Sequence, residues 1–289
     1  MGAAVAIVTD WLDFRSGEAI PSGLAVDADD RLFVGLRAGA AVDARERGGT
    51  EVLVFGPDRT DPTTLRLPEV AQLHAISIHG DTLLVTDRWS HAVFRYDLAG
   101  RPRGRLGTPD RCSDTGSTQP GGPVPRPAGP FHSPTQAVQD QAGRVYVSDG
   151  YGNARVHVFD HSGRLLRSWG GYGTGPGEFR LPHSVALDTG GRVLVCDREN
   201  SRIQCFDPDG GRPGDWWHTH RPTDVYVRGD DVFVSDLSPA VTRLTPDGEV
   251  VARWPVPPSA HNLCVDRGGR IYLTHIHGQS TTTITEVNR

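Results

Sequence analysis

Three histidines carry the clearest chemical signal in this sequence. His74, His183 and His261 each occupy the second position of a short alternating run, in LHAISI, PHSVAL and AHNLCV. Catalytic zinc sites commonly have three protein ligands and a fourth position open to water or substrate, and neutral imidazole is a frequent ligand. Iron, cobalt or nickel would accept the same ligands. If the fold brings these side chains together, they form a candidate metal centre.

A second group of polar residues follows other alternating runs. Arg37, Arg88 and Arg198 occupy equivalent positions at the ends of such runs, and Tyr151 lies one residue beyond the matching position. Arginine presents a planar, permanently charged fork to a carboxylate. A tyrosine beside a metal and arginines would give up its proton more readily and could serve as a general base.

The alternative role for each of these arginines is structural. An arginine at a strand end could pair with a strand-end aspartate of a neighbouring repeat, because ion-pair networks also gather charge. The aspartates in question are Asp87, Asp149 and Asp197. They are themselves expected to cap turns by accepting hydrogen bonds from backbone amides, and we assign them no catalytic role.

A sixfold repeat supplies the elements that would position these residues. Each repeat has an alternating run, a polar turn, a second run that ends near Asp, and a third run. The repeats begin at Pro21, Leu73, Pro134, Pro182, Pro222 and Ala260. Helical periodicity is nearly absent, and each repeat has the length of a four-stranded blade. We therefore expect an all-β protein, a six-bladed β-propeller that forms a single domain over residues 1–289.

The ends of the chain and two inserts complete the predicted architecture. The last repeat has room for three strands, so residues 4–11 are expected to supply the outer strand that closes the ring. Residues 38–50 interrupt the first blade, and residues 100–132 form a long loop rich in Pro and Gly between blades two and three. This composition is typical of a surface loop, and a lid over the channel is the alternative.

Propeller geometry should bring the two groups of polar residues to one mouth of the central channel. The first strand of a blade lines the channel and the second runs back beside it, so the start of one and the end of the other share a face. The second residue of the six repeats reads Ser22, His74, Thr135, His183, Thr223 and His261. Histidine in alternate blades places three imidazoles about 120° apart around one axis. A lone histidine is usually a hydrogen-bonded polar residue, but this alternation favours a metal site.

Other polar residues could surround such a centre. Asn262 follows His261 directly, Arg88 ends a run in the second repeat, and His275 and His277 end a run close to the channel. We regard Asn262, Arg88 and His277 as candidates for the shell around the metal ligands. The remaining histidines lack the symmetry, and we interpret these as surface or loop residues: His91, His132, His218 and His220.

Composition narrows the class of protein. The formal net charge is -5 without a basic stripe, so neither a nucleic acid nor an anionic membrane is an expected partner. No apolar run is long enough to span a bilayer, and the N-terminus lacks the positive region of a secretory signal. The four cysteines have neither CxxC spacing nor the density of a disulfide scaffold. We therefore expect a cytoplasmic protein.

Three segments resemble the peptidyl-α-hydroxyglycine α-amidating lyases, a family of NHL-repeat propellers. These segments are VYVSDGYGNARVHVFD from Val145, GPGEFRLPHSVALD from Gly175 and CDRENSRIQCFDPDG from Cys196. The resemblance implies a six-bladed propeller with a catalytic zinc on three histidines, which match His74, His183 and His261. It also implies a catalytic tyrosine, two active-site arginines and a structural calcium bound through backbone carbonyls. The matching residues are Tyr151, Arg37 and Arg198, with Leu24 and Ile76 at the calcium.

The activity implied by the resemblance is cleavage of an N-acyl α-hydroxyglycine into a primary amide and glyoxylate. Zinc would act as a Lewis acid on the α-hydroxyl, Tyr151 would take the hydroxyl proton, and Arg37 or Arg198 would hold the carboxylate. The substrate is thus expected to be a small or peptide-derived carboxylate, or a related carbinolamide or hemiaminal. A biosynthetic enzyme with a different small substrate, a metal-dependent propeller hydrolase or lactonase, and an NHL-repeat binding scaffold are the alternatives.

Two positions depart from the family pattern. The family has Asp after the last histidine, where this chain has Asn262, so a charge-dependent role of that residue is absent. The family has a disulfide cysteine after the tyrosine, where this chain has Gly152, so secretion is not implied. Because of the first change, the resemblance alone does not fix the substrate.

Overall fold

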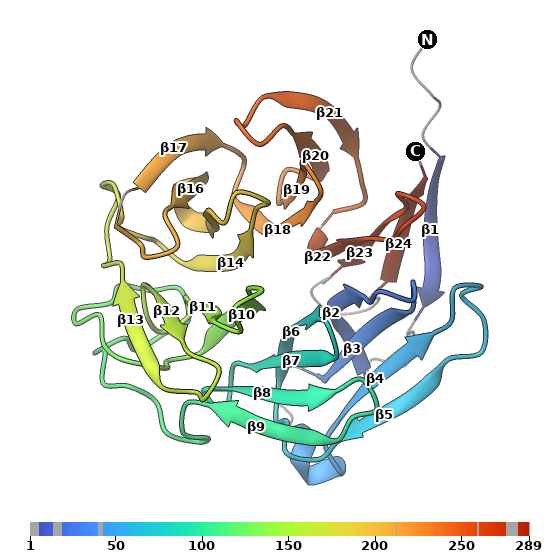
Figure 1. Cartoon of the computed structure of the whole chain (residues 1–289), viewed down its shortest axis with the longest axis horizontal. Helices are drawn as coiled ribbons and strands as arrows, with labels where there is room; N and C mark the ends of the chain where they lie inside the picture. Colours follow the sequence, from blue (N-terminus) through green and yellow to red (C-terminus); the bar gives the residue numbers. More distant parts are fainter. Residues whose placement is uncertain are drawn as a thin grey trace.

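The described residues form six four-stranded antiparallel sheets arranged in a ring (Figure 1). The computed structural model describes residues 6–13, 19–39, 43–211, 213–258, 260–275 and 283–288. Blade one contains β2 (Ala19–Val26), β3 (Leu32–Ala38), β4 (Thr50–Phe55) and β5 (Thr63–Leu67). Blade two contains β6 (Leu73–His79), β7 (Thr82–Asp87), β8 (Ala92–Asp97) and β9 (Pro102–Leu106). In each of these blades the chain runs from the innermost strand to the outermost.

The next three blades repeat this order. Blade three contains β10 (Pro134–Gln139), β11 (Val145–Asp149), β12 (Arg155–Phe159) and β13 (Leu165–Trp169). Blade four contains β14 (Pro182–Leu187), β15 (Val193–Asp197), β16 (Arg202–Phe206) and β17 (Pro213–His218). Blade five contains β18 (Pro222–Arg228), β19 (Asp231–Asp236), β20 (Ala240–Leu244) and β21 (Val250–Pro255).

Blade six joins the two ends of the chain. Its strands are β22 (Ala260–Val265), β23 (Ile271–His275), β24 (Thr283–Asn288) and β1 (Ala6–Asp13). The N-terminal strand β1 pairs antiparallel with β24 at the outer edge of the sheet (Figure 1). The ring is therefore closed by hydrogen bonds between strands from opposite ends of the chain.

The fold class predicted from the repeat is confirmed. Five of the inner strands begin at the residue where the corresponding repeat begins, and only β2 starts earlier, at Ala19 instead of Pro21. The helical content of the described residues is two short 3-10 helices, η1 (Ala44–Arg47) and η2 (Arg198–Asn200). Neither is long enough to cross a membrane.

Apolar side chains fill the spaces between neighbouring blades. Strand β7 contributes to two of these layers. Its Leu83 and Val85 pack toward blade one, whereas Leu84 packs toward blade three. Successive side chains of a strand point to opposite faces, so a middle strand covered on both faces is buried throughout. The core is thus divided into layers between blades.

The prediction of a loop over residues 100–132 is wrong for its first residues. Residues 102–106 form β9, the outer strand of blade two, whose side chains are exposed except for the last. An exposed edge strand interrupted by Gly104 at a φ of 121° has little alternation that a sequence pattern could detect. The remaining segment, residues 107–133, packs against blade three, and we call it the strap. In the insert of blade one, residues 44–47 form η1, which Asp43 caps.

Candidate metal and active site

A β-bulge at the second residue of each repeat places the candidate ligands. The pairing of β6 with β7 skips His74, and the pairing of β14 with β15 skips His183. In blade six the irregularity spans His261 and Asn262. A bulge adds one unpaired residue and changes the direction of its side chain. The same irregularity in alternate blades therefore directs three histidine side chains toward one another.

The three histidines form a compact buried cluster. One ring nitrogen from each of His74, His183 and His261 lies within 4.8 Å of the others. The ring centroids are 4.9 to 5.0 Å apart, and the rings are inclined by 70 to 88°. The exposed fractions are 1%, 1% and 8%, so the cluster opens to solvent mainly beside His261. Three imidazoles gathered in this way could hold a metal ion.

Hydrogen bonds to Nδ1 orient the rings. Nδ1 of His74 lies 2.6 Å from the carbonyl oxygen of Thr135, and Nδ1 of His183 lies 2.6 Å from that of Thr223. A carbonyl oxygen can only accept, so each Nδ1 carries the proton and each Nε2 keeps its lone pair. Such partners raise the basicity of metal ligands and fix their orientation. Thr135 of blade three thus orients His74 of blade two, and Thr223 of blade five orients His183 of blade four.

The third histidine has a side-chain partner instead. Nδ1 of His261 lies 2.8 Å from Oδ1 of Asn262, and Nδ2 of Asn262 lies 3.4 Å from Asp224. The predicted contact of Asn262 with the cluster is therefore present, and it is made by a neutral amide. Asp224 also accepts a hydrogen bond of 2.8 Å from the amide of Leu263. A carboxylate lies close to this histidine, but it comes from the neighbouring blade.

The protonation state of the three histidines suits metal binding. Burial lowers the pKa of His74 and of His183 well below the usual value. Repulsion from His261 lowers the pKa of His74 further, and repulsion from Arg198 lowers that of His183 further. Burial, followed by repulsion from Arg37, lowers the pKa of His261 to about 3. All three imidazoles are therefore neutral at pH 7, which is the form that binds metals.

These shifts predict acid instability of the metal-free protein. An unfolded chain protonates His261 below about pH 6.5, whereas the folded chain does so only near pH 3, so the unfolded state binds more protons in between. Stability is therefore lost as the pH falls through this window, by about 2 kcal/mol for His261 at pH 5 relative to pH 7. Urea unfolding of chelator-treated protein at both pH values measures this loss. His261→Gln should reduce it by the same amount, and an unchanged loss would contradict the assignment.

Tyr151 reaches the cluster from the end of β11. Its hydroxyl lies 3.0 Å from Nε2 of His183 and 3.3 Å from Nε2 of His74. The guanidinium carbons of Arg88 and Arg198 lie 5.2 and 5.9 Å from the centre of its ring. The phenol oxygen is thus placed at the nitrogen atoms that would bind a metal, with two cations on its ring.

The ion pairs between the arginines and the strand-end aspartates, which were the alternative role for these arginines, are absent from the described residues. Asp87 accepts from the backbone amides of four residues, Asp149 from that of His132, and Asp197 from that of Arg180, as expected of turn caps. The side-chain partners of Asp149 include His157, and Asp197 pairs with Arg202. These carboxylates therefore bind other groups than Arg37, Arg88 and Arg198.

Among the described residues, two arginines of the site have no carboxylate partner. Arg198 donates from Nε to Glu199 at 2.9 Å, but in the described part of the chain Arg37 and Arg88 have no such partner. The Nε of Arg37 is buried and makes no hydrogen bond to any residue that the structure describes. Burial, and then repulsion from Arg88, lowers the pKa of Arg37 to about 10. A buried donor without an acceptor is costly, so this arrangement favours an anionic ligand.

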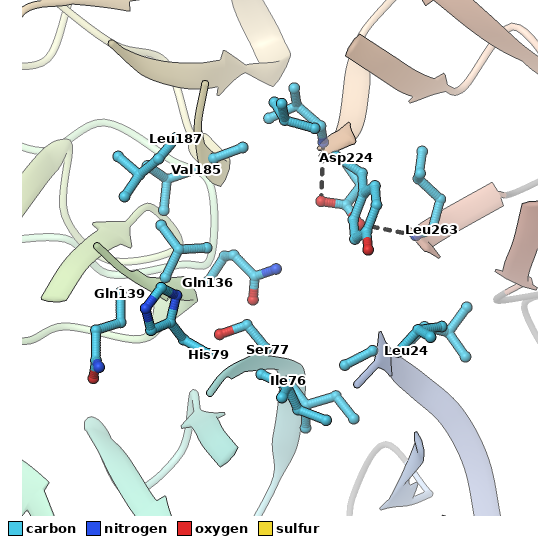
Figure 2. Close-up of a pocket in the computed structure, with 18 residues that line it drawn as sticks. Leu24, Ile76, Ser77, His79, Gln136, Gln139, Val185, Leu187, Asp224 and Leu263 are labelled. Carbon is cyan, nitrogen blue, oxygen red and sulfur yellow. Dashed lines mark hydrogen bonds between the residues drawn. The ribbon is translucent and has the colours of Figure 1, made fainter. Parts of the chain in front are cut away.

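Other predicted residues line a cavity farther along the inner strands. A cavity of about 230 Å³ is bordered by Leu24, Ile76, Gln136 and Asp224, among other residues (Figure 2). Asp224 is buried, and burial raises its pKa to about 6. The two residues predicted at a calcium therefore share a cavity with a carboxylate that the sequence did not single out.

The remaining candidates are dispersed. His277 lies outside the described residues. His275 is buried and its Nδ1 lies 3.1 Å from the carbonyl oxygen of Pro258, so it faces the connection between blades. His91 lies in a turn and accepts a hydrogen bond from the amide of Ser133 in the strap, whereas His132 belongs to the strap, and the two ring centroids are 5.6 Å apart. Sequence reasoning missed Thr115 of the strap, whose hydroxyl binds the backbone beside Tyr151.

Comparison with known proteins gives one family and several relatives. The NHL repeat model matches residues 179–206, most of it in blade four. A peptidylglycine alpha-amidating monooxygenase of Rattus norvegicus is 33% identical over 227 residues, which cover 70% of this chain and 22% of that protein. The peptidyl-alpha-hydroxyglycine alpha-amidating lyase 1 of Drosophila melanogaster is 30% identical over 169 residues, which cover 55% of this chain and 28% of that protein. The chain thus spans less than a third of the length of either relative.

The solved structures show the same fold at low identity. Virginiamycin B lyase from Staphylococcus aureus superposes with a TM-score of 0.62 at 12% identity, over 99% of this chain and 100% of that one. At this identity the likeness concerns the fold alone. The relationship to known activities therefore rests on the sequence relatives.

Proposed function

This chain is an NHL-repeat β-propeller related in sequence to the peptidyl-α-hydroxyglycine α-amidating lyases, and we propose that it is a metal-dependent carbon–nitrogen lyase. The proposed substrate is an N-acyl α-hydroxyglycine or a related carbinolamide, and the products are an amide and glyoxylate or another aldehyde. The observation that carries this proposal is the Tyr151 hydroxyl on a neutral three-histidine cluster, near Arg37 and Arg88, for which the described residues provide no carboxylate partner. A single propeller domain would contain the whole site.

The residues of the cluster fit a divalent metal. Three neutral imidazoles, each with its proton on Nδ1 and a lone pair on Nε2, match the donor set of zinc, and iron, cobalt or nickel would accept it as well. We propose that His74, His183 and His261 hold Zn²⁺. When bound there, the metal would supply Lewis-acid polarisation of the substrate hydroxyl.

Tyr151 is proposed to move the proton. As a phenolate it would accept the proton of the α-hydroxyl, the new carbon–oxygen double bond would form, and the carbon–nitrogen bond would break. The phenol would then return the proton to the departing amide nitrogen, so the reaction needs no added oxidant or water. A group that acts first as base and then as acid must stay within hydrogen-bond reach of both atoms.

Arg37 is proposed to bind the substrate carboxylate, with Arg198 and Arg88 adding positive charge. Arg37→Ala should raise KM for an N-acyl α-hydroxyglycine by about thirtyfold, because a charge-assisted hydrogen bond is lost. An N-(hydroxymethyl)amide lacks the carboxylate, so its kcat/KM should change by less than about threefold. Steady-state kinetics with both substrates measure the difference. Arg164→Ala, which removes an exposed arginine of blade three, is the matched control.

If Arg37→Ala weakened both substrates equally, Arg37 would not be the carboxylate site. The same result in Arg164→Ala would point to a general effect of removing positive charge. The proposed carboxylate site is supported only if Arg37→Ala, and not Arg164→Ala, raises KM for the substrate that carries the carboxylate.

We also propose a structural Ca²⁺ in the cavity of Figure 2. Its support is that Leu24 and Ile76, whose carbonyls would be the ligands, border the same cavity as the buried carboxylate of Asp224. Calcium prefers oxygen ligands from carboxylates and backbone carbonyls. The charge that Asn262 lacks would then come from the adjacent blade.

A small substrate in a cytoplasmic biosynthetic route fits the remaining observations. Cys112 is exposed and Cys196 and Cys264 are buried, each as a free thiol, which suits a reducing compartment. The net charge of -5 makes a nucleic acid or an anionic membrane an unsuitable partner.

The direct test of the proposed function is product release. Incubation with a set of small N-acyl α-hydroxyglycines, such as the benzoyl and acetyl compounds, should release glyoxylate and the primary amide in equal amounts. A hydrolase would release the free acid, and a binding scaffold would release nothing. Absence of glyoxylate across the set would overturn the assignment.

A further inference from the structure

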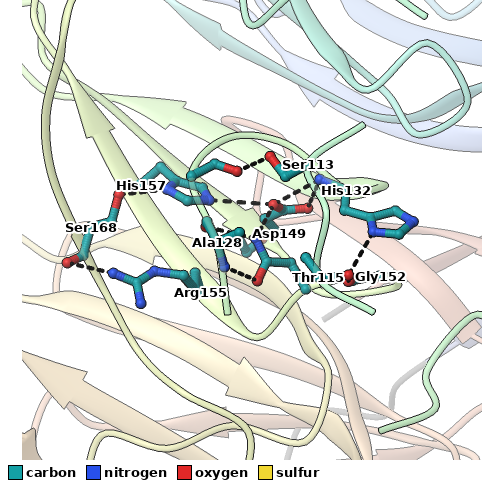
Figure 3. A network of polar contacts seen from close by, with 12 residues as sticks. Ser113, Thr115, Ala128, His132, Asp149, Gly152, Arg155, His157 and Ser168 are labelled. Atoms are coloured by element: carbon teal, nitrogen blue, oxygen red, sulfur yellow. Dashed lines mark hydrogen bonds and ion pairs between the residues drawn. The ribbon is translucent and has the colours of Figure 1, made fainter. Parts of the chain in front are cut away.

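We propose that the strap, residues 107–133, positions Tyr151 through Thr115. This inference rests on the proposed role of Tyr151 in the reaction. Figure 3 shows the polar network in which Thr115, His132, Asp149 and Gly152 meet beside blade three. Thr115 is completely buried, although it lies in a segment without strands or helices.

The strap binds both sides of the backbone at Tyr151 and Gly152. The amide of Tyr151 donates to Ser133 at 3.3 Å, and its carbonyl accepts from the amide of Gly121 at 2.7 Å. The amide of Gly152 donates to the carbonyl of His132 at 2.9 Å. The carbonyl of Gly152 accepts from the hydroxyl of Thr115 at 2.6 Å. Four hydrogen bonds therefore fix a segment of two residues, and one of them comes from a side chain.

The hydroxyl of Thr115 links the strap to His132. Its single proton goes to the carbonyl of Gly152, because a carbonyl can only accept. The hydroxyl oxygen lies 2.8 Å from Nδ1 of His132, so Nδ1 must be the donor in this pair. The amide of Ser117 also donates to that oxygen, at 3.2 Å. Thr115 thus satisfies three partners at once.

The two glycines around Tyr151 have no room for a side chain. A Cβ at Gly152 would lie 2.3 to 2.7 Å from ring atoms of His132, and a Cβ at Gly150 would lie 2.2 Å from the carbonyl oxygen of Pro182. The imidazole of His132 therefore occupies the space that a side chain at residue 152 would need. We call Thr115 and His132, which hold the segment of Tyr151 and Gly152 by non-covalent contacts, the clamp.

The clamp is itself anchored in blade three. The carboxylate of Asp149 accepts from the amide of His132 at 2.9 Å, and from Asn153 at 2.9 Å. Nε2 of His157 lies 3.3 Å from the same carboxylate (Figure 3). Phe131 of the strap is fully buried in the apolar layer between blades two and three. The position of Tyr151 therefore depends on contacts with a segment that is part of the core.

Thr115→Val tests the clamp, because it keeps the shape and removes the hydroxyl. A misplacement of a reacting group by about 1 Å can cost up to about a hundredfold in rate. We expect Thr115→Val to lower kcat at least about tenfold and to leave KM within about twofold, and Thr115→Ser to restore kcat. Thr108→Val makes the same exchange at an exposed position of the strap and should be neutral.

A double-mutant cycle separates positioning of Tyr151 from a general loss of structure. If Thr115 acts through Tyr151, Thr115→Val should lower kcat no further in a Tyr151→Phe protein, because the group that it positions has no hydroxyl. A tenfold loss that persists in that background would overturn the proposal. So would a Thr115→Val protein with wild-type kcat.

Amide hydrogen exchange tests the clamp even if no glyoxylate is released. Thr115→Val should accelerate exchange of the amides of Tyr151 and Gly152 by at least about tenfold, while the amides of β19 stay unchanged and Thr108→Val has no effect. Unchanged exchange at Tyr151 and Gly152 would overturn the positioning role. Failure of the lyase assay with accelerated exchange would overturn the proposed function alone.

Discussion

Replacing Tyr151 by phenylalanine is expected to lower kcat by about a thousandfold, because general acid–base catalysis by one residue contributes roughly 10²- to 10⁴-fold. The variant loses the oxygen that lies 3.0 Å from His183 but keeps the ring that faces Arg88 and Arg198. KM should therefore stay within about twofold. Steady-state glyoxylate release measures both constants.

The control for Tyr151→Phe is its metal content. The histidines have their own partners at Nδ1, so the bound metal should remain at the wild-type level. Equal turnover in the variant would remove Tyr151 from the mechanism. Loss of metal together with activity would make it a structural residue of the metal centre.

His183→Ala is expected to abolish tight metal binding and to reduce kcat/KM by more than about a hundredfold. Loss of an outer-shell partner of a metal ligand already costs 10- to 100-fold in affinity or activity, and loss of a ligand removes more. The substitution also leaves the carbonyl of Thr223 without the Nδ1 proton of His183. Elemental analysis of the purified protein and the glyoxylate assay measure the two effects.

His161→Ala provides the matched control for the loss of a histidine. His161 is exposed in a turn of blade three, away from the cluster, so this variant should retain metal and activity. If His183→Ala kept its metal, the three-histidine site would be wrong, and a binding scaffold or a different metal position would fit better.

The architecture could be predicted because a propeller repeats its register. Each repeat carries the same alternation, and the bulge recurs at its second residue, so reading that position around the ring was enough to bring His74, His183 and His261 together. The position of Tyr151 followed from the same argument, since the second strand of a blade ends at the face where the first begins. Periodicity therefore carried both the fold and the central cluster.

The partners of these residues could not be predicted in the same way. The acceptors of His74 and His183 are backbone carbonyls of Thr135 and Thr223, and a backbone group leaves no mark in a residue pattern. Whether Arg37 has a carboxylate partner depends on which acidic side chains lie beside it in the folded chain, and among the described residues none does. The strap has no repeat, so the role of Thr115 became visible only through its contacts.

Asn262 and a buried carboxylate from the neighbouring blade lie together beside His261. Asn262 keeps the acceptor for His261, while the nearby carboxylate belongs to Asp224 of blade five. Because this carboxylate is buried and its pKa is raised to about 6, a second one at residue 262 would add like-charge repulsion. A neutral amide at residue 262 is thus consistent with the charge of its neighbours.

The most direct measurement is a titration of the metal-free protein with Zn²⁺ while glyoxylate release from N-benzoyl α-hydroxyglycine is followed. The three-histidine site predicts that activity rises in proportion to the added metal and stops rising at about one equivalent per chain. Tyr151→Phe should bind the same equivalent without comparable activity. Full turnover by the metal-free protein, or saturation with Zn²⁺ without release of glyoxylate, would contradict the proposed metal-dependent lyase.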